Sequence, residues 1–302
     1  MDKDQLYPRA FRLAEKSPAK HPVGAVRVPS GTPGPGPLGM RRLGDSAQKI
    51  RLDGNKIPRG GTRFLEERLC RIPEFFRTFT TNPVSFMTVK ERFAGIIGWF
   101  AEHMPEADTE LHYRTPFELL VAVMLSAQCT DKRVNLVTPA LFERFPDARR
   151  MALAEPDEVF EYVKSVSYPN AKAEHLVAMA RRLEEAYGGR VPDTVEELVT
   201  LQGVGRKTAN VIVSIVYGKP AMAVDTHVFR VAERIGLTTR SRNPLETERK
   251  LVAHIPAELL GRAHHWLILH GRYVCTARTP KCADCGVAAW CRQRQRELKK
   301  EA

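Results

Sequence analysis

The hydrophobic residues from Met87 onward recur at intervals of three and four positions, which is the spacing of one buried face of an α-helix. The pattern is clearest directly after Met87, where the apolar positions on one face are Val89, Phe93, Ile96, Ile97 and Phe100. Thr88 precedes this face and Glu91 follows Thr88 by three residues, which is the sequence of a capping box. These positions predict a helix that begins after Thr88.

Start and stop signals of the same kind predict further helices. Thr115 is a capping residue before Pro116 at the first helical position, and this helix is expected to run to about Gln128. The other predicted helices are 156–163, one from Asn170 to the stop at Gly188-Gly189, one capped by Thr194 that ends at Leu201, one from near Arg206 to Gly218, one from Asn243-Pro244, and one from Leu259 to Tyr273. Sustained period-two alternation is missing, so strands are not needed and the predicted fold is all-α.

Two glycines stand one residue apart between two of these helices, in the stretch Leu201 to Val211. A connection this tight is expected to force positive φ, which Gly203 and Gly205 tolerate, and it predicts a helix-hairpin-helix. The missing Cβ atoms leave backbone N–H groups accessible to an anion such as DNA phosphate, with Val204 as a hydrophobic pin. The alternative is that Gly203 only ends one helix and Gly205 only starts the next.

Lys207 and Asp225 carry the candidate chemistry. Lys207 falls in the first turn of the second hairpin helix, where the helix dipole is expected to lower the pKa of the ammonium group and leave a nucleophilic amine. A lysine that only contacts phosphate fits the same position. Asp225 precedes another helical pattern, so it is a candidate N-cap as well as a candidate acid–base residue. Neither residue alone decides between these interpretations.

Four of the six cysteines gather near the C-terminus with the spacing C-x6-C-x2-C-x5-C. They are Cys275, Cys282, Cys285 and Cys291. Four clustered thiols in a chain without a secretory signal indicate a metal site rather than disulfides. The spacing alone fits both an all-cysteine zinc site and an iron–sulfur cluster. Cys129 lies far from these four in the sequence and is expected to be a small buried hydrophobe.

The chain has 302 residues, enough for one large or two ordinary domains, and its formal net charge is +12. A basic chain suits a polyanionic partner, but the excess is unevenly distributed. Residues 1–86 hold 16 Lys and Arg against 8 Asp and Glu, which leaves 31 against 27 in residues 87–302. Net charge is therefore weak evidence for DNA binding by the second part, and the placement of single cations must carry that argument.

Residues 1–86 are expected to form a disordered basic extension, because the stretch from Pro29 to Gly39 is rich in Pro and Gly. A short amphipathic helix is predicted within 64–79. The extension is interpreted as a regulatory tail, a weak DNA-binding arm, or the product of a wrongly chosen upstream start codon. Long apolar runs and a signal-peptide core are missing, so the protein is expected to be cytoplasmic, nucleoid-associated and not membrane-bound, with organellar targeting left open.

The stretch Leu201 to Val211 and the later segment around Asp225 resemble the endonuclease III family of DNA base-excision glycosylases. The cysteine spacing is similar to that of the family's [4Fe–4S] cluster, and the resemblance extends from about Met87 to the C-terminus. It implies that the hairpin grips DNA, that Lys207 attacks C1′ of the damaged nucleotide, and that Asp225 assists. It also implies that Gln128 fills the gap left by an extruded base.

The same resemblance places the cluster beneath a loop that faces DNA, and Arg278 and Lys281 in this loop are expected to contact phosphates. Two positions depart from the family pattern. Gln202 replaces the usual proline of the hairpin, which is expected to loosen the turn slightly. Tyr168, followed by Pro169, holds the position of the family's leucine wedge, which puts contact with the opposite base in question.

The resemblance implies two helical domains, one at 109–219 with the hairpin and one formed by 87–108 and 220–302 around the cluster. The expected function is that of a monomeric, bifunctional DNA glycosylase and abasic-site lyase, which removes oxidised pyrimidines from double-stranded DNA. Two alternatives stay open, a pyrimidine-dimer glycosylase of the same family and a non-catalytic iron–sulfur protein that binds DNA or senses redox state. Lys207 and Asp225 together count against the second alternative, because a protein that only binds DNA needs neither.

Overall fold

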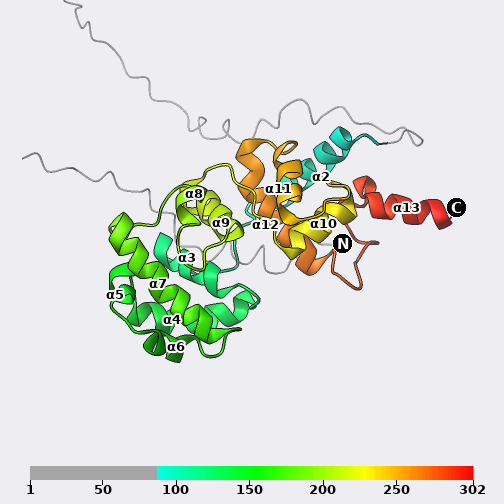
Figure 1. The fold of residues 1–302 in the computed structure, drawn as a ribbon. Coiled ribbons are helices and arrows are strands. Elements are labelled where there is room, and N and C mark those ends of the chain that lie inside the picture. Colours follow the sequence, from blue (N-terminus) through cyan, green and yellow to red (C-terminus); the bar gives the residue numbers. More distant parts are fainter. Residues whose placement is uncertain (1–86, 302) are drawn as a thin grey trace, which may run out of the picture. The chain divides into compact units, whose positions relative to one another are not determined.

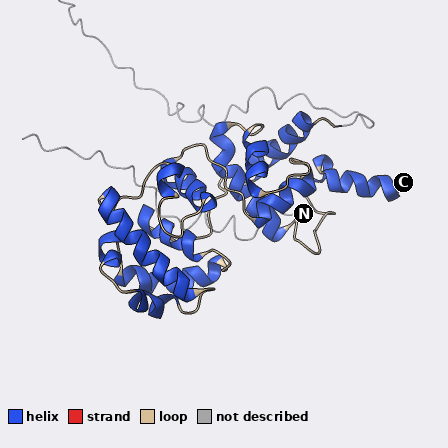
Figure 2. Cartoon of the chain, in the orientation of Figure 1, coloured by secondary structure: helices blue, strands red, loops and turns tan. Residues whose placement is uncertain are grey.

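The computed structural model describes residues 87–301, and every regular element in this range is a helix (Figure 1, Figure 2). The predicted all-α fold is confirmed. The described residues belong to one compact unit. None of their helices combines the length and the apolar composition of a membrane span. The predictions for residues 1–86, including the helix within 64–79, lie outside the described range.

The helices follow one another with short connections. In chain order they are α2 (Val89–His103), α3 (Pro116–Leu125), α4 (Asp131–Arg144), α5 (Ala148–Ala152), α6 (Pro156–Val163), α7 (Pro169–Tyr187), α8 (Val195–Leu198), α9 (Arg206–Tyr217), α10 (Thr226–Ile235), α11 (Pro244–Val252), the 3-10 turn η2 (Ala257–Leu259), α12 (Leu260–Tyr273), the 3-10 turn η3 (Ala288–Trp290) and α13 (Arg292–Glu301). The helix-hairpin-helix consists of α8, the turn at 199–205 and α9.

Local capping residues start the helices where the sequence predicts them. The Thr88 hydroxyl accepts a hydrogen bond from the Glu91 backbone at 3.2 Å, and the Glu91 carboxylate accepts one from the Thr88 backbone at 2.8 Å. Thr115 and Asn243 cap α3 and α11, each directly before a proline at the first helical position. These starts depend only on neighbours in the sequence.

Two helix ends differ from their predicted positions. The helix that begins at Pro116 ends at Leu125 and not near Gln128, because Gln128 has φ +54 and cannot continue a right-handed helix. The first hairpin helix ends at Leu198 and not at Leu201, since the Leu201 backbone N–H turns back to the Leu198 carbonyl at 3.1 Å. The sequence also did not predict α5, which has five residues, or α13, which is polar along most of its length.

The buried hydrophobic side chains form two clusters. The first core is built from α3 to α9 and is centred on α3, whose residues 119–122 and 125 are fully buried. The second core is built from α2, α10 to α12 and the cysteine segment, with fully buried Trp266 at its centre. The Trp266 indole N–H donates to the Met104 carbonyl at 2.7 Å, so this large side chain leaves no unpaired donor in the core.

Polar contacts connect elements of the two cores. The buried Asn210 amide on α9 donates to the Met222 carbonyl at 3.0 Å, in the chain segment that leads to α10. Arg206 at the start of α9 pairs with Glu248 on α11 at 2.6 Å. The first contact holds α9 against the segment that leads to α10, and the second holds the start of α9 against α11. The N-termini of α9 and α10 carry the candidate catalytic residues.

Candidate active site

The hairpin turn places its two glycines in different conformations. Gly203 has φ +76, and a Cβ there would lie 2.9 Å from the Cβ of His175, so the turn requires glycine at this position. Gly205 has φ −90, so the expectation of positive φ is wrong for this residue. A Cβ at Gly205 would meet no protein atom within 4 Å, and α9 has no side-chain N-cap. The N–H groups that start α9 therefore face open space, which suits an incoming anion.

Val204, between the two glycines, is 5% exposed and belongs to the first core. Val204, expected from the sequence to act as a hydrophobic pin, is thus a packed side chain that fixes the turn. Because the turn is fixed, the backbone N–H groups of α9 point in one direction without the help of a ligand. In the alternative interpretation Gly203 ends one helix and Gly205 starts the next. It does not describe Gly203, because α8 ends at Leu198 with Val199 as its C-cap, but it does describe Gly205, which is the N-cap of α9.

Lys207 is the second residue of α9 and is half-buried. Burial lowers the pKa of its ammonium group, the positive charge of Arg272 acts in the same direction, and the carboxylates of Asp225 and Asp131 act against them. The net shift is downward, as expected from the sequence, but its main cause is burial. Burial favours the neutral amine, which a nucleophile requires, whereas the nearby carboxylates favour the ammonium form and only partly offset the effect of burial.

Asp225 is the N-cap of α10, and its Oδ1 accepts a hydrogen bond from the Val228 backbone at 2.8 Å. The capping interpretation is therefore confirmed. Capping fixes the carboxylate in the electrostatic surroundings of Lys207, where it favours the charged amine. A carboxylate held by a helix cap needs no further ordering before it accepts a proton, so capping and acid–base chemistry are compatible at this position.

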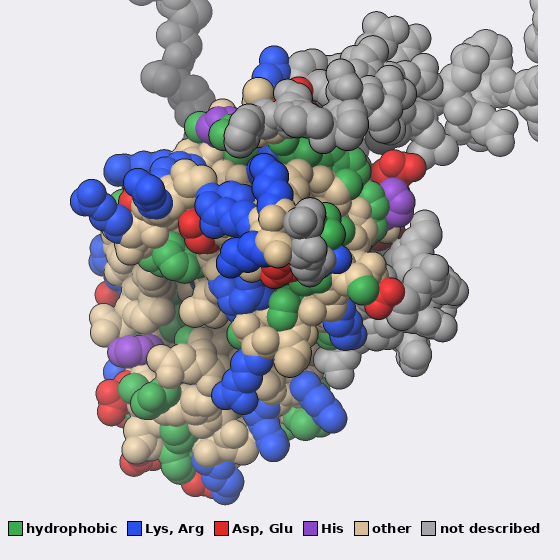
Figure 3. Space-filling model, turned by 90° about the vertical axis from the view of Figure 1, so that its right-hand side faces the viewer, with side chains coloured by type: hydrophobic (Ala, Val, Ile, Leu, Met, Phe, Trp, Pro, Cys, Tyr) green, Lys and Arg blue, Asp and Glu red, His purple; other side chains and the backbone are tan. Residues whose placement is uncertain are grey.

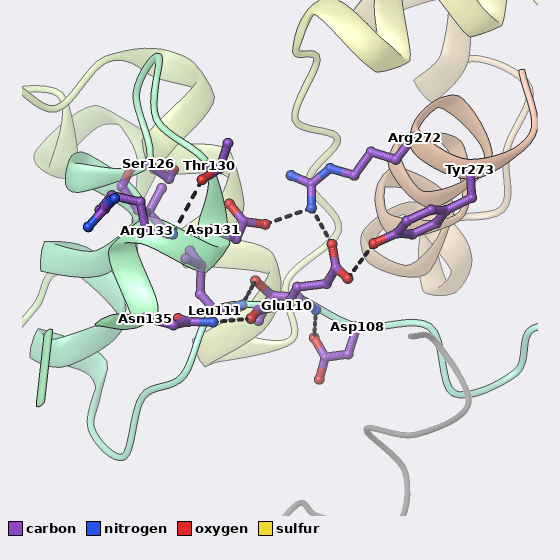
Figure 4. A network of polar contacts seen from close by, with 12 residues as sticks. Asp108, Glu110, Leu111, Ser126, Thr130, Asp131, Arg133, Asn135, Arg272 and Tyr273 are labelled. Atoms are coloured by element: carbon purple, nitrogen blue, oxygen red, sulfur yellow. Dashed lines mark hydrogen bonds and ion pairs between the residues drawn. The ribbon is translucent and has the colours of Figure 1, made fainter. Parts of the chain in front are cut away.

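A polar network flanks Lys207 and joins the two cores (Figure 4). Arg272 extends from the end of α12 and pairs with Asp131 at the start of α4 at 2.7 Å and with Glu110. Tyr273 donates to the second oxygen of Glu110 at 2.7 Å. Asp131 is therefore already paired with a guanidinium group on the other core, and this ion pair fixes its position beside the site.

Two buried histidines also border this site. His264 and His265, in α12, are 2% and 7% exposed, and the His264 Nδ1 lies 2.8 Å from the Ala223 carbonyl. Burial lowers the pKa of both rings, to about 4 for His265, and the charge of Lys207 contributes in the same direction. Both imidazoles are therefore neutral at pH 7 and add no positive charge near the amine.

The sequence did not indicate the network or the histidines as part of the site. Arg272 and Asp131 are 141 residues apart in the chain, and no local motif links them. The pair His264-His265 inside a predicted buried helix is the one signal that was available, because buried histidines are unusual enough to suggest a polar site nearby.

Gln128 and Tyr168 come together at a small cavity on the first core. Both have positive φ, at +54 and +55, and Tyr168 is 66% exposed. The Ser167 hydroxyl donates to the Gln128 carbonyl at 2.7 Å, which joins the two segments. Gln128, Tyr168 and Gly203 of the hairpin all line this cavity of about 190 Å³. Three residues that the sequence suggested as DNA contacts thus share one surface region, whereas Lys207 and Asp225 are not among its lining residues.

The four C-terminal cysteines lie together beside α12. None of the four is part of a disulfide, and Cys275 and Cys291 are buried. They influence one another electrostatically, and burial raises the pKa of Cys285 to about 12. Among the described residues, no group of three or more His, Cys, Asp or Glu side chains has the closeness that a single metal ion needs. Four cysteine sulfurs are the usual donor set of an iron–sulfur cluster, in which each thiolate binds a different iron.

Positively charged side chains border this cysteine group, which a cluster with four thiolate ligands requires for charge balance. Arg234 Nη1 lies 3.6 Å from the Cys275 sulfur, and the charge of Arg92 acts on Cys291. His270 Nε2 lies 3.8 Å from the Cys285 sulfur. The donor set and its surroundings therefore fit an iron–sulfur cluster. Cys129, by contrast, packs at the edge of the first core and is half-buried, so the expectation of a small buried hydrophobe is met only in part.

The loop between the first two cysteines is exposed at Arg278 and Lys281. Arg234 holds the base of this loop through hydrogen bonds to the Thr276 and Ala277 carbonyls, at 2.6 and 3.0 Å. Figure 3 shows many Lys and Arg side chains gathered on one face of the molecule, with fewer Asp and Glu between them. The gathering of cations on one face is therefore stronger evidence for a polyanionic partner than the small net charge of residues 87–302.

Comparisons with known proteins agree with this geometry. Residues 121–257 match the family described as HhH-GPD superfamily base excision DNA repair protein, and residues 275–291 match the iron–sulfur binding domain of endonuclease III. The helical fold, the hairpin and the cysteine group together define a base-excision DNA repair protein with an iron–sulfur domain.

The relatives identify the family more narrowly. The endonuclease III of Rickettsia felis is 47% identical to this chain over 192 residues, which cover 64% of this chain and 90% of that protein. The endonuclease III of Escherichia coli is 42% identical over 195 residues, which cover 65% of this chain and 92% of that protein. A structure of a trapped covalent endonuclease III–DNA intermediate aligns with a TM-score of 0.67 at 40% identity, covering 70% of this chain and all of that one. The chain belongs to the endonuclease III family. It is a DNA glycosylase and abasic-site lyase of base excision repair with a [4Fe–4S] cluster.

Proposed function

We propose that Lys207 is the nucleophile of this glycosylase and lyase, and that Asp225 is its acid–base partner. The observation that carries the proposal is the position of the Lys207 amine, which is half-buried at the N-terminus of the hairpin helix and has a lowered pKa between two carboxylates. A lysine that only contacts phosphate would gain from full exposure and full charge. The surroundings of Lys207 disfavour both.

The proposed substrate is an oxidised pyrimidine in double-stranded DNA. Gly203, Val204 and Gly205 present the N–H groups of α9 to a backbone phosphate, and Arg278 and Lys281 contact phosphates from the cysteine loop. Gln128 occupies the gap left by the extruded base and Tyr168 acts as the wedge, which the shared cavity and the exposure of Tyr168 support. Two solved relatives, one covalent and one non-covalent, are endonuclease III–DNA complexes, which supports DNA as the partner.

In the proposed reaction the damaged nucleotide first leaves the stack, since its C1′ is not accessible inside the duplex. Asp225 takes a proton from the Lys207 ammonium, and the free amine attacks C1′ while the glycosidic bond breaks and the base departs with a proton. The sugar opens to a Schiff base on Lys207. Loss of a proton from C2′ then expels the 3′ phosphate and breaks the strand, and water finally releases Lys207.

The cluster is assigned a structural part in this proposal. Cys275, Cys282, Cys285 and Cys291 hold it, and its bound state orders the loop that carries Arg278 and Lys281.

We further propose that residues 109–219 form one helical domain, that 87–108 and 220–302 form the other, and that the enzyme acts as a monomer in the cytoplasm at the nucleoid. The two separate hydrophobic cores support the division into domains.

The test of Lys207 is borohydride trapping during turnover, because reduction of a Schiff base makes a protein–DNA adduct permanent. The wild-type chain is expected to form this adduct, and Lys207→Gln is expected to lose both the adduct and strand cleavage while DNA affinity falls only modestly. Asp225→Asn keeps the helix cap and is expected to lose most of the rate. An adduct formed by Lys207→Gln would overturn the assignment, and loss of affinity together with activity would favour the phosphate-contact interpretation.

The substrate class is tested separately with duplexes that contain thymine glycol, a pyrimidine dimer, uracil or a preformed abasic site. Preference for thymine glycol over the dimer supports the proposed function, and the reverse preference supports the alternative dimer glycosylase. A protein that binds all four duplexes without cleaving any of them would instead be the non-catalytic iron–sulfur protein.

A further inference from the structure

A buried ammonium group lies at the base of the two segments that carry Gln128 and Tyr168. Lys172, in the first turns of α7, is only 8% exposed. Its Nζ donates to the Leu125 carbonyl at 2.8 Å and to the Ala127 carbonyl at 2.7 Å. The Leu125 carbonyl ends α3 and the Ala127 carbonyl lies in the turn that follows, where a helix leaves acceptors unpaired and where its dipole attracts a positive charge.

The contacts of Lys172 lead directly to both candidate DNA-contacting residues. Ala127 is the neighbour of Gln128, and the Lys172 backbone N–H donates to the Tyr168 carbonyl at 3.1 Å. Gln128 and Tyr168 are two of the three non-glycine residues with positive φ among residues 87–301. A side-chain-bearing residue stays in this conformation only where the surrounding contacts hold it. The Lys172 ammonium and the Ser167 hydroxyl supply such contacts.

We propose that Lys172 is a positioning residue for base extrusion, whose ammonium clamps the end of α3 to the start of α7 so that Gln128 and Tyr168 are in place before DNA arrives. The proposal rests on the proposed function, because it assumes that these two residues act on the duplex. Lys172 lines the cavity that Gln128 and Tyr168 share, and burial lowers the pKa of its ammonium group. A charge kept in spite of burial is consistent with the two charge-assisted hydrogen bonds that it makes.

A purely structural role for Lys172 is the competing explanation, and α7 contains a matched control for it. Arg181 lies on the same helix and donates to the Ala152 and Ala154 carbonyls, both at 3.0 Å. It therefore clamps the end of α5 as Lys172 clamps the end of α3. No residue proposed to contact DNA lies near the Arg181 clamp, so its loss should affect stability without affecting extrusion.

The experiment compares base removal from a paired thymine glycol with cleavage of a preformed abasic site, using the full chain with its cluster. Lys172→Met is expected to reduce the ratio of the two rates about tenfold, which corresponds to roughly 1.4 kcal/mol, because extrusion is hardest where pairing and stacking are intact. Lys172→Arg keeps the charge and the donors and is expected to recover part of the ratio. Arg181→Met is expected to lower the Tm and leave the ratio unchanged.

A second readout follows extrusion directly. With 2-aminopurine beside the lesion, the fluorescence rise that accompanies unstacking is expected to be slower with Lys172→Met than with Arg181→Met. If Lys172→Met does not fold, Ser167→Ala keeps the proposal testable, because it removes the second contact between the two segments, the exposed hydrogen bond from Ser167 to the Gln128 carbonyl. The ratio of base removal to abasic-site cleavage is expected to fall about threefold in Ser167→Ala, as for the loss of one hydrogen bond of modest strength.

Equal losses on both substrates in Lys172→Met, or an unchanged ratio in both Lys172→Met and Ser167→Ala, would overturn the positioning role and leave the proposed function intact. Failure of the proposed function has a different signature, since the wild-type chain would then cleave neither substrate and form no borohydride adduct.

Discussion

At the scale of single residues, the candidate nucleophile occupies a position that is unfavourable for its own charge. Burial and Arg272 disfavour the charged amine of Lys207, and Asp225 and Asp131 only partly offset them. The rings of His264 and His265 are neutral, so they stabilise neither the charged amine nor the carboxylates. An unpaired buried charge lowers the stability of the folded state, so reactivity at this position is expected to come at the expense of stability.

This cost predicts that Lys207→Gln unfolds at a higher Tm than the wild type near pH 7. The pKa of Lys207 is lower in the folded state than in the unfolded state, so the unfolded chain binds more protons between those two values. The stability of the wild type should therefore rise with pH through this window, and the advantage of the variant should shrink toward pH 10. Thermal unfolding of both proteins across this pH range measures the effect. A constant or growing advantage would contradict the assigned pKa shift.

Lys207 and Asp225 could be identified from the sequence because each lies in a short motif of neighbouring residues. It gave the direction of the pKa shift of Lys207 from the helix dipole but not its main cause, because burial depends on residues distant in the chain. Arg272, Asp131 and Glu110 had no local signature, since their partners lie more than a hundred residues away.

At the scale of elements, the hairpin separates two functions of glycine that look identical in the sequence. Gly203 is needed for the turn itself, because its φ is positive and His175 occupies the space of a Cβ. Gly205 has an ordinary backbone conformation and open space around it. The first glycine therefore serves the fold, whereas the second keeps the start of α9 uncovered.

Substitutions at the two glycines should therefore act in opposite directions on stability. Gly203→Ala is expected to cost about 1–3 kcal/mol, from the left-handed conformation and the close contact with His175. Gly205→Ser adds a side-chain N-cap and is expected to stabilise the protein by about 0.3 kcal/mol, yet to weaken DNA binding because its hydroxyl occupies the N–H groups of α9. Denaturant unfolding and DNA titration on both variants measure this. Unchanged DNA affinity in Gly205→Ser would show that phosphate does not bind at this helix start.

The helix starts were predictable and two helix ends were not, for a physical reason. The caps at Thr88, Thr115 and Asn243 act within four residues of themselves. The end of α3 depends on the left-handed conformation of Gln128, and Lys172, which comes from another helix, binds the Leu125 and Ala127 carbonyls around this end. Tertiary contacts thus override the local helix signal at this end.

At the scale of the whole molecule, charge is divided unevenly between the parts of the chain. Residues 1–86 carry most of the excess of Lys and Arg, whereas all described helices and all proposed catalytic residues lie within 87–301. The segment that carries most of the net charge is therefore not the segment that carries the proposed catalytic residues.

Removal of residues 1–86 is accordingly expected to preserve strand cleavage at low salt. If this segment binds DNA, the shortened protein should bind more weakly and its affinity should depend less steeply on salt, because fewer phosphate counterions are released. DNA titrations at several salt concentrations with both forms provide the measurement. Loss of cleavage at low salt would show that the catalytic part needs the first 86 residues.

The segment that joins α9 to α10 has a consequence for where the chain tolerates insertions. Residues 221–224 are buried, and Asn210 and His264 each bind a carbonyl of this segment, those of Met222 and Ala223. One added residue would move Asp225 out of register with Lys207 without changing either side chain. Length variation should therefore concentrate at exposed turns such as Gly188-Gly189, whereas the segment between the helices that carry Lys207 and Asp225 should keep a fixed length.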